Sequence, residues 1–66
     1  MTLIVNGQQH EGTDSLTLEQ LLKDLGTVPE RVAVMVNDRI IHRTARGETQ
    51  LKDQDRIEIL TFVGGG

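Results

Sequence analysis

The chain ends in Phe62-Val63-Gly64-Gly65-Gly66, so an apolar run stops in three glycines that carry the C-terminal carboxylate. Glycine has no Cβ and accepts nearly any backbone conformation. A terminal glycine run therefore makes a thin tail that can thread a narrow channel into the active site of a partner. The carboxylate of Gly66 then becomes a functional group that the tail delivers to chemistry performed elsewhere.

The glycine run also has a plain structural interpretation. Chain ends are often frayed, and short tags of small residues are common additions to proteins. The glycines alone leave both interpretations open. We expect a folded domain over residues 1–63, a flexible tail over residues 64–66, and a monomer when the protein is alone.

Composition argues against several other classes of function. The chain has 66 residues, which makes one domain near the lower size limit for independent folding. It has no cysteine, so disulfides, thiolate metal sites and Cys nucleophiles are absent and a reducing, cytoplasmic setting is favoured. Its longest apolar run, residues 32–36, is too short to cross a bilayer. A net charge of −3 and a single aromatic residue provide neither a basic stripe nor a stacking platform for nucleic acid.

Short strands are predicted at the beginning of the chain and again in its second half. Residues 3–5 are apolar, Asn6-Gly7 is a strong signal for a type I′ hairpin turn, and residues 8–11 can return as a polar edge strand. A turn closed by Pro29 precedes three more predicted strands. These strands cover residues 32–37, 39–41 and 56–62.

One amphipathic helix is predicted between these strands. Leucines recur at helical spacing from Thr17 to Leu25, with Thr17 and Gln20 placed as a capping box and Gly26 as a C-terminal stop. A single leucine stripe needs one sheet face to cover it. The order β-β-α-β-β-β therefore predicts an α+β fold, in which a mixed sheet of about five strands packs on one main helix.

Several stretches of residues add a family resemblance to this order of elements. They are Ile4-Val5-Asn6-Gly7, Thr17 to Leu25, Val32-Ala33-Val34-Met35-Val36-Asn37 with Ile40-Ile41 and Arg43, and Leu51-Lys52-Asp53-Gln54-Asp55-Arg56-Ile57-Glu58-Ile59 leading to Val63-Gly64-Gly65-Gly66. Over nearly its whole length the chain resembles the ThiS family, the small sulfur carriers of thiamine biosynthesis. The resemblance implies the ubiquitin-like β-grasp fold.

Two places depart from the family pattern. Gln54 stands between two aspartates where relatives usually have glycine. If that turn needs a positive φ, the side chain costs on the order of 1 kcal/mol. Residues 44–48 lack the short helical stretch that many relatives carry, so we expect a loose loop there. Both departures concern turn and loop geometry and leave the chemistry of the tail unchanged.

The resemblance implies that the chain is a co-substrate and not an enzyme. By analogy, a partner related to ubiquitin-activating enzymes joins the Gly66 carboxylate to AMP, using ATP and magnesium. A persulfide then displaces AMP and leaves a thiocarboxylate, whose sulfur a thiazole synthase accepts. Gly64, Gly65 and Gly66 thread the partner's active site, while the catalytic groups, the metal and the nucleotide all belong to the partners and the chain binds no cofactor.

The polar residues inside the chain show no catalytic or metal-binding pattern. His10 and His42 have no cysteine nearby and no metalloprotease spacing, so solvated surface histidines explain them better than a metal site. Asp53 and Asp55 lack the ligand number of a calcium loop, and a turn before a strand explains both.

A docking surface for partners is predicted on the face of the sheet that the helix leaves open. Successive side chains of a strand point to opposite faces of the sheet, so Ile57 and Ile59 are predicted to face the helix, together with Leu3, Val5, Val34 and Val36. The open face would then carry the apolar residues Ile4, Met35, Leu60 and Phe62. A bulge in the last strand would instead return Leu60 or Phe62 to the core, and the sequence leaves this alternative open.

The residues and the resemblance together leave three classes of function. The resemblance favours a thiamine sulfur carrier, and the short chain favours it over a carrier for another acceptor, such as the small subunit of molybdopterin synthase. The second class is a ubiquitin-like binding module or protein modifier without sulfur transfer. The third, a small enzyme, is disfavoured because no nucleophile and base occur together.

Overall fold

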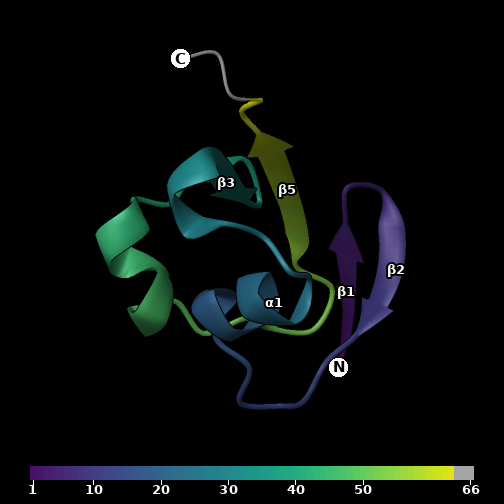
Figure 1. The fold of residues 1–66 in the computed structure, drawn as a ribbon. Helices are drawn as coiled ribbons and strands as arrows, with labels where there is room; N and C mark the ends of the chain where they lie inside the picture. Colours follow the sequence, from purple (N-terminus) through teal and green to yellow (C-terminus); the bar gives the residue numbers. More distant parts are fainter. Residues whose placement is uncertain (64–66) are drawn as a thin grey trace.

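The computed structural model describes residues 1–63, which form a five-stranded mixed sheet with α1 packed on one face (Figure 1). The strand order is β2-β1-β5-β3-β4, with β1 and β5 parallel and the other neighbours antiparallel. The predicted number and order of strands are confirmed. The elements are β1 (Thr2–Val5), β2 (Gln8–Glu11), α1 (Leu18–Asp24), the 3-10 helix η1 (Pro29–Arg31), β3 (Val32–Val36), β4 (Arg39–Ile40), the 3-10 helix η2 (Arg43–Glu48) and β5 (Arg56–Thr61).

Helix α1 begins and ends where its local signals predict. The Thr17 hydroxyl accepts from the Gln20 backbone N–H at 3.2 Å, and the Gln20 side chain accepts from the Thr17 N–H at 3.1 Å. This is the predicted capping box, which satisfies two backbone donors that the first turn leaves free. At the other end Gly26 has a φ of 74°, and its N–H donates to the Lys23 carbonyl at 3.0 Å. Glycine takes this left-handed conformation without a Cβ clash, so the helix stops there.

Two tight turns set the registers of the outer strands. Asn6 and Gly7 have φ values of 49° and 81°, as a type I′ turn requires, so the predicted first hairpin is confirmed. Asn37 and Asp38 have φ values of 51° and 69° and make a second two-residue turn. Because Asn37 belongs to this turn, β3 ends at Val36, one residue earlier than predicted.

The core lies between α1 and the face of the sheet that the alternating side-chain pattern predicts to be buried. The six strand residues predicted to face the helix all do so: four are buried and two are partly buried against the core. The buried ones are Leu3, Val34, Val36 and Ile57, and the partly buried ones are Val5 and Ile59. Leucines of α1 cover them from the other side, which confirms the predicted packing.

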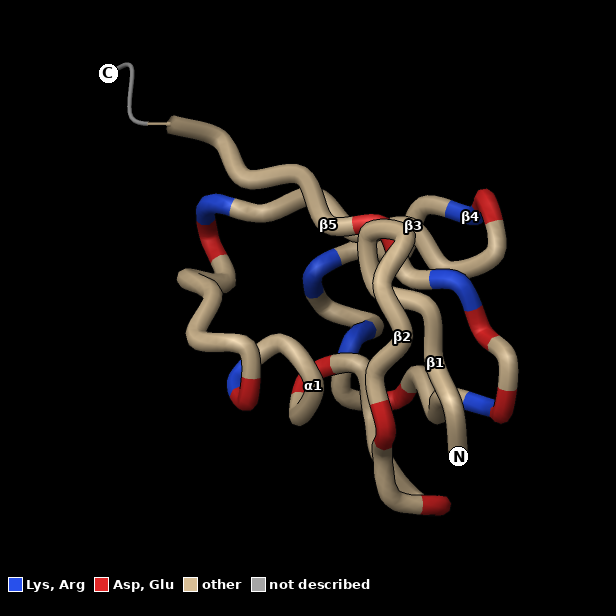
Figure 2. The backbone as a smooth tube through the Cα atoms, turned by 90° about the vertical axis from the view of Figure 1, so that its right-hand side faces the viewer, with Lys and Arg blue, Asp and Glu red and all other residues tan. Residues whose placement is uncertain are grey.

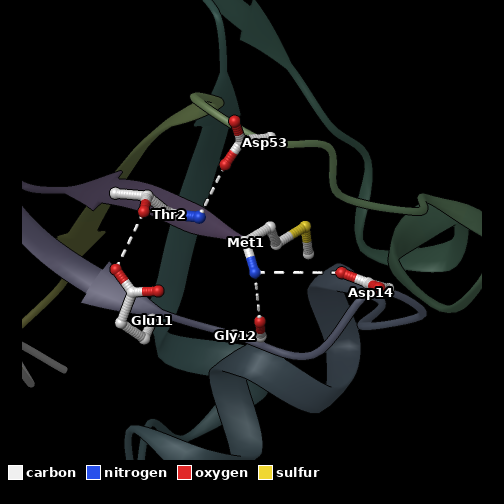
Figure 3. A network of polar contacts seen from close by, with 6 residues as sticks. All are labelled: Met1, Thr2, Glu11, Gly12, Asp14 and Asp53. Carbon is white, nitrogen blue, oxygen red and sulfur yellow. Dashed lines mark hydrogen bonds and ion pairs between the residues drawn. The ribbon is translucent and has the colours of Figure 1, made fainter.

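Polar contacts tie the beginning of β1 to its neighbours (Figure 3). The amino group of Met1 donates to the Gly12 carbonyl oxygen at 2.7 Å. The Thr2 N–H donates to the Asp53 carboxylate at 2.7 Å, and the Thr2 hydroxyl donates to Glu11 at 2.8 Å. Asp53 lies in a turn before β5, as predicted, and its carboxylate also links that turn to β1.

Gln54 occupies a turn position that suits glycine. Its φ is 70°, a conformation that brings the Cβ of an L residue too close to the backbone. The Gln54 N–H donates to the Thr2 carbonyl at 2.6 Å, so the turn is held against the start of β1. The departure from the family pattern therefore lies at a strained position.

Gln54→Gly should raise the free energy of unfolding by about 0.5–1 kcal/mol, since relief of the strain exceeds the entropy that glycine adds to the unfolded chain. Urea denaturation measures the change. Gln9→Gly, at an exposed and extended position of β2, is the matched control and should lower stability. An unchanged or lower stability for Gln54→Gly would contradict the inference that the positive φ of Gln54 destabilises the folded chain.

The segment expected to be a loose loop is instead ordered, so that expectation was wrong. Residues 43–48 form η2, and the Arg46 side chain within it is buried. Its guanidinium donates from Nη1 to the Pro29 carbonyl at 3.1 Å and from Nη2 to the Val32 carbonyl at 2.8 Å. These two bonds fasten η2 to η1 and to the start of β3.

Arg46→Met should lower the free energy of unfolding by about 2 kcal/mol, because two largely buried carbonyls lose their donors. The change can be measured by urea denaturation. Arg39→Met, on exposed β4, removes the same charge and should shift stability by less than about 0.5 kcal/mol. Equal stability of the two variants would show that the Arg46 bonds do not hold η2.

Candidate functional site

The base of the glycine tail is the end of β5. This strand runs beside β1 and projects beyond it toward the end of the chain (Figure 1). The Phe62 N–H donates to the Arg31 carbonyl at 2.7 Å, which prolongs the β3–β5 pairing past the last strand residue. Val63 follows with 94% of its surface exposed. The tail thus leaves the sheet from a fixed point at Phe62.

The predicted tail residues Gly64, Gly65 and Gly66 lie outside the described residues. Their threading of a partner's active site, the flexibility of residues 64–66 and the modification of Gly66 therefore stay predictions. The structure establishes the position from which the tail starts.

The open face of the sheet carries the four residues predicted for docking. Leu60 and Phe62 are 59% and 60% exposed, while Ile4 and Met35 are half-buried. The pairing of β5 with β3 is continuous from Ile57 to Thr61, so no bulge turns Leu60 or Phe62 into the core. The face assignment follows from this register, and the docking role stays a prediction.

Ile40 is a further apolar residue of this face, and the sequence did not predict it. It is 74% exposed and lies opposite Met35 in the β3–β4 register, so the two side chains share one face. The signal that could have found it is the two-residue turn after Val36, because that turn length sets the register. We call these five residues the open-face patch: Ile4, Met35, Ile40, Leu60 and Phe62.

The end of β5 carries no charged residue, although Arg31 lies beside Phe62 across the strand pairing. From the middle of β5 to the last described residue the tube in Figure 2 carries no charge, while residues of both signs are scattered over the rest of the molecule. On the open face, the Arg56 guanidinium pairs with the Asp38 carboxylate at 2.9 Å, and both side chains are exposed. A partner approaching the tail therefore meets an apolar patch with charged residues at its border, among them Glu58 opposite Met35 and Arg31 beside Phe62.

The histidines and aspartates noted in the sequence do not form a site. His10 is half-buried in β2 and His42 is exposed before η2. Among residues 1–63, no group of three His, Cys, Asp or Glu side chains could hold a metal ion. The Asp55 carboxylate accepts from the Asn37 side chain at 2.9 Å and from the Lys52 N–H at 2.8 Å, so it serves the turns at the end of the sheet.

A cleft of about 290 Å³ lies among α1, η1 and η2. Its lining contains no Ser, Thr, Cys or His, so it offers no nucleophile paired with a histidine base. The lining residues are Glu19, Leu22, Lys23, Pro29, Glu30, Arg43 and Arg46.

Among residues 1–63, no helix reaches the length and apolarity of a membrane span.

Known structures share this fold. The crystal structure of the thiamine biosynthesis protein ThiS from Geobacter metallireducens matches with a TM-score of 0.84 and 39% identity, over 100% of both chains. A solution structure of a thiamine biosynthesis protein from the same organism matches with a TM-score of 0.81 and covers 88% of that chain. These similarities confirm the predicted ubiquitin-like β-grasp.

Sequence comparisons give relatives of two lengths. A thiazole synthase from Magnetococcus marinus is 41% identical over 66 residues, which are 20% of that protein, so the chain spans about a fifth of its length. The uncharacterized protein ycf40 of Pyropia yezoensis is 38% identical, and the match covers 93% of it. The model of the ThiS family matches residues 3–66, which include the terminal glycines. The chain therefore belongs to the ThiS family.

Proposed function

We propose that this chain is a sulfur carrier of thiamine biosynthesis, which is loaded with sulfur at the carboxylate of Gly66. The observation that carries the proposal is a ThiS-family β-grasp whose last strand leads directly out of the sheet into the terminal glycines. The chain acts as a co-substrate, because the chemistry occurs on its C-terminus inside a partner.

The loading chemistry begins with activation of the carboxylate. A carboxylate resists nucleophilic attack because it is charged and oxide is a poor leaving group. A Gly66 oxygen attacks the α-phosphorus of ATP and releases pyrophosphate, which leaves an acyl adenylate with AMP as a good leaving group. The partner supplies the magnesium site that neutralises the phosphates. The chain itself binds neither ATP nor metal in this scheme.

Sulfur enters in the second step. The terminal sulfur of a persulfide attacks the acyl carbon and AMP leaves, which gives an acyl disulfide. A thiol then reduces the sulfur–sulfur bond, and the sulfur attached to the acyl carbon leaves as a thiocarboxylate. Glycines at positions 64–66 suit both steps, because a tail without side chains can enter a narrow site.

The partners follow from this scheme. They are an adenylyltransferase related to ubiquitin-activating enzymes, a persulfide donor and a thiazole synthase that accepts the sulfur, all in the cytoplasm. Two relatives that contain a region similar to the whole chain are named thiazole synthase, which supports the last of these. The open-face patch is the surface on which such partners would dock, because an exposed apolar area beside the tail brings partner and carboxylate together.

Pyrophosphate release tests the proposed activation. With ATP, magnesium and a ThiS-type adenylyltransferase, the chain should give a burst of one pyrophosphate for each carrier molecule. Hydroxylamine should then trap the adenylate. No burst, from an enzyme shown to be active on its own carrier, would contradict the proposal.

A further inference from the structure

Backbone groups of β5 alternate between the two edges of the strand. The Phe62 N–H donates to the Arg31 carbonyl at 2.7 Å, in register with the β3–β5 pairing. Antiparallel strands exchange hydrogen bonds at every second residue. The backbone groups of Ile57, Ile59 and Thr61 therefore point to the opposite edge, where β1 lies.

The first two of these positions have partners. The Asn6 N–H donates to the Ile57 carbonyl at 2.9 Å, at the end of the parallel pairing with β1. At Ile59 strand β1 has ended, and the Asn6 side chain takes its place. Its Oδ1 accepts from the Ile59 N–H at 2.8 Å, and its Nδ2 donates to the Ile59 carbonyl at 3.2 Å. A side-chain amide offers the same donor and acceptor as a peptide group, so this edge already binds a peptide-like group.

Thr61 is the next position on this edge and is exposed. Within residues 1–63, no strand or side chain pairs with its backbone on that side. Val63, two residues further along the chain, is also exposed, and an extended backbone there would present its groups to the same edge. An edge strand with free N–H and C=O groups is a template for pairing with another chain. Leu60 and Phe62 flank this edge on the open-face patch, so a partner that covers the patch brings its own backbone near Thr61.

We propose that an extended backbone segment of the adenylating partner pairs with the end of β5 at Thr61 and with Val63 beyond it, adding a strand to the sheet. This inference rests on the proposed function, since it names the contact that holds the base of the tail during activation. Pairing of this kind depends on main-chain hydrogen bonds and is independent of the side chain at position 61. It orients the tail by extending the strand from which the tail emerges.

Thr61→Pro tests the pairing, with Thr61→Ala as the matched control. Proline removes the N–H of residue 61, which faces the free edge, and leaves the bonds to β3 in place; alanine removes only the side chain. Thr61→Pro should bind the adenylyltransferase about tenfold more weakly, the order expected for one lost intermolecular hydrogen bond, while Thr61→Ala binds as the wild type does. Isothermal titration calorimetry measures both affinities.

A backbone ester tests whether an effect of Thr61→Pro comes from the lost N–H or from distortion of the backbone by the proline ring. The chain is short enough for chemical synthesis, so an ester in place of the Leu60–Thr61 amide removes the same N–H and leaves φ free. It should reproduce the tenfold loss. Wild-type affinity for the ester chain would overturn the proposed pairing and leave the sulfur-carrier function intact. No binding by the wild-type chain itself would instead overturn the proposed function, and this inference with it.

Discussion

A chain whose Gly66 carboxylate is converted to a primary amide should accept no sulfur, while its stability stays that of the unmodified chain. The amide lacks the anionic oxygen that attacks ATP, so activation stops at its first step. The expected effect is a complete loss of pyrophosphate release and of sulfur incorporation. Chemical synthesis gives the amide, and the same synthesis with a free acid is the matched control.

Stability should not change because the core ends well before the tail. The last buried residue of the described chain is Ile57, and Val63 is almost fully exposed. Urea denaturation of the amide and acid forms should give the same midpoint. Deletion of one glycine is less specific, since the shorter chain still ends in Gly-Gly with a free carboxylate. Loading of the amide form would show that the reactive group lies elsewhere.

Leu60→Asp should weaken binding to the adenylyltransferase about 100-fold and leave the fold intact. A charge at the centre of an apolar contact must be desolvated when the partner binds, and residues at such centres are often worth several kcal/mol. The side chain is 59% exposed in the free protein, so the folded chain tolerates the charge. Calorimetric titration gives the affinity, and urea denaturation gives the stability.

Leu25→Asp is the control for this substitution. Leu25 is 38% exposed and caps α1, the helix that packs on the opposite face of the sheet, so its variant should bind the partner normally. Unfolding of Leu60→Asp would show that Leu60 belongs to the core. A folded Leu60→Asp chain with unchanged affinity would show that the patch is not the docking surface.

Local signals made most of the fold predictable from the sequence. The Asn6-Gly7 turn and the capping box of Thr17 and Gln20 each depend on residues within a few positions, and the structure confirms them. Alternation also selected the helix-facing side of the sheet correctly. It could not decide whether the last strand bulges, because that depends on the pairing of β5 with β3, which only the structure supplies.

The features that could not be predicted from the sequence depend on distant contacts. Arg46 orders η2 by bonding the carbonyls of Pro29 and Val32, and nothing in residues 43–48 signals those acceptors. Charged side chains are almost always exposed, so burial of an arginine cannot be predicted unless its hydrogen-bond acceptors are known. Ile40 joins the open-face patch through the register of a short strand, which a strand assignment alone does not reveal.

Intact-protein mass spectrometry tests the central claim most directly. The chain would be incubated with ATP, magnesium, a ThiS-type adenylyltransferase, a persulfide donor and a thiol reductant. We expect a mass gain equal to the replacement of one oxygen by sulfur, confined by fragmentation to Gly66 and absent without ATP. An unchanged mass, in the presence of a partner that loads its own carrier, would contradict sulfur carriage and favour a ubiquitin-like binding module.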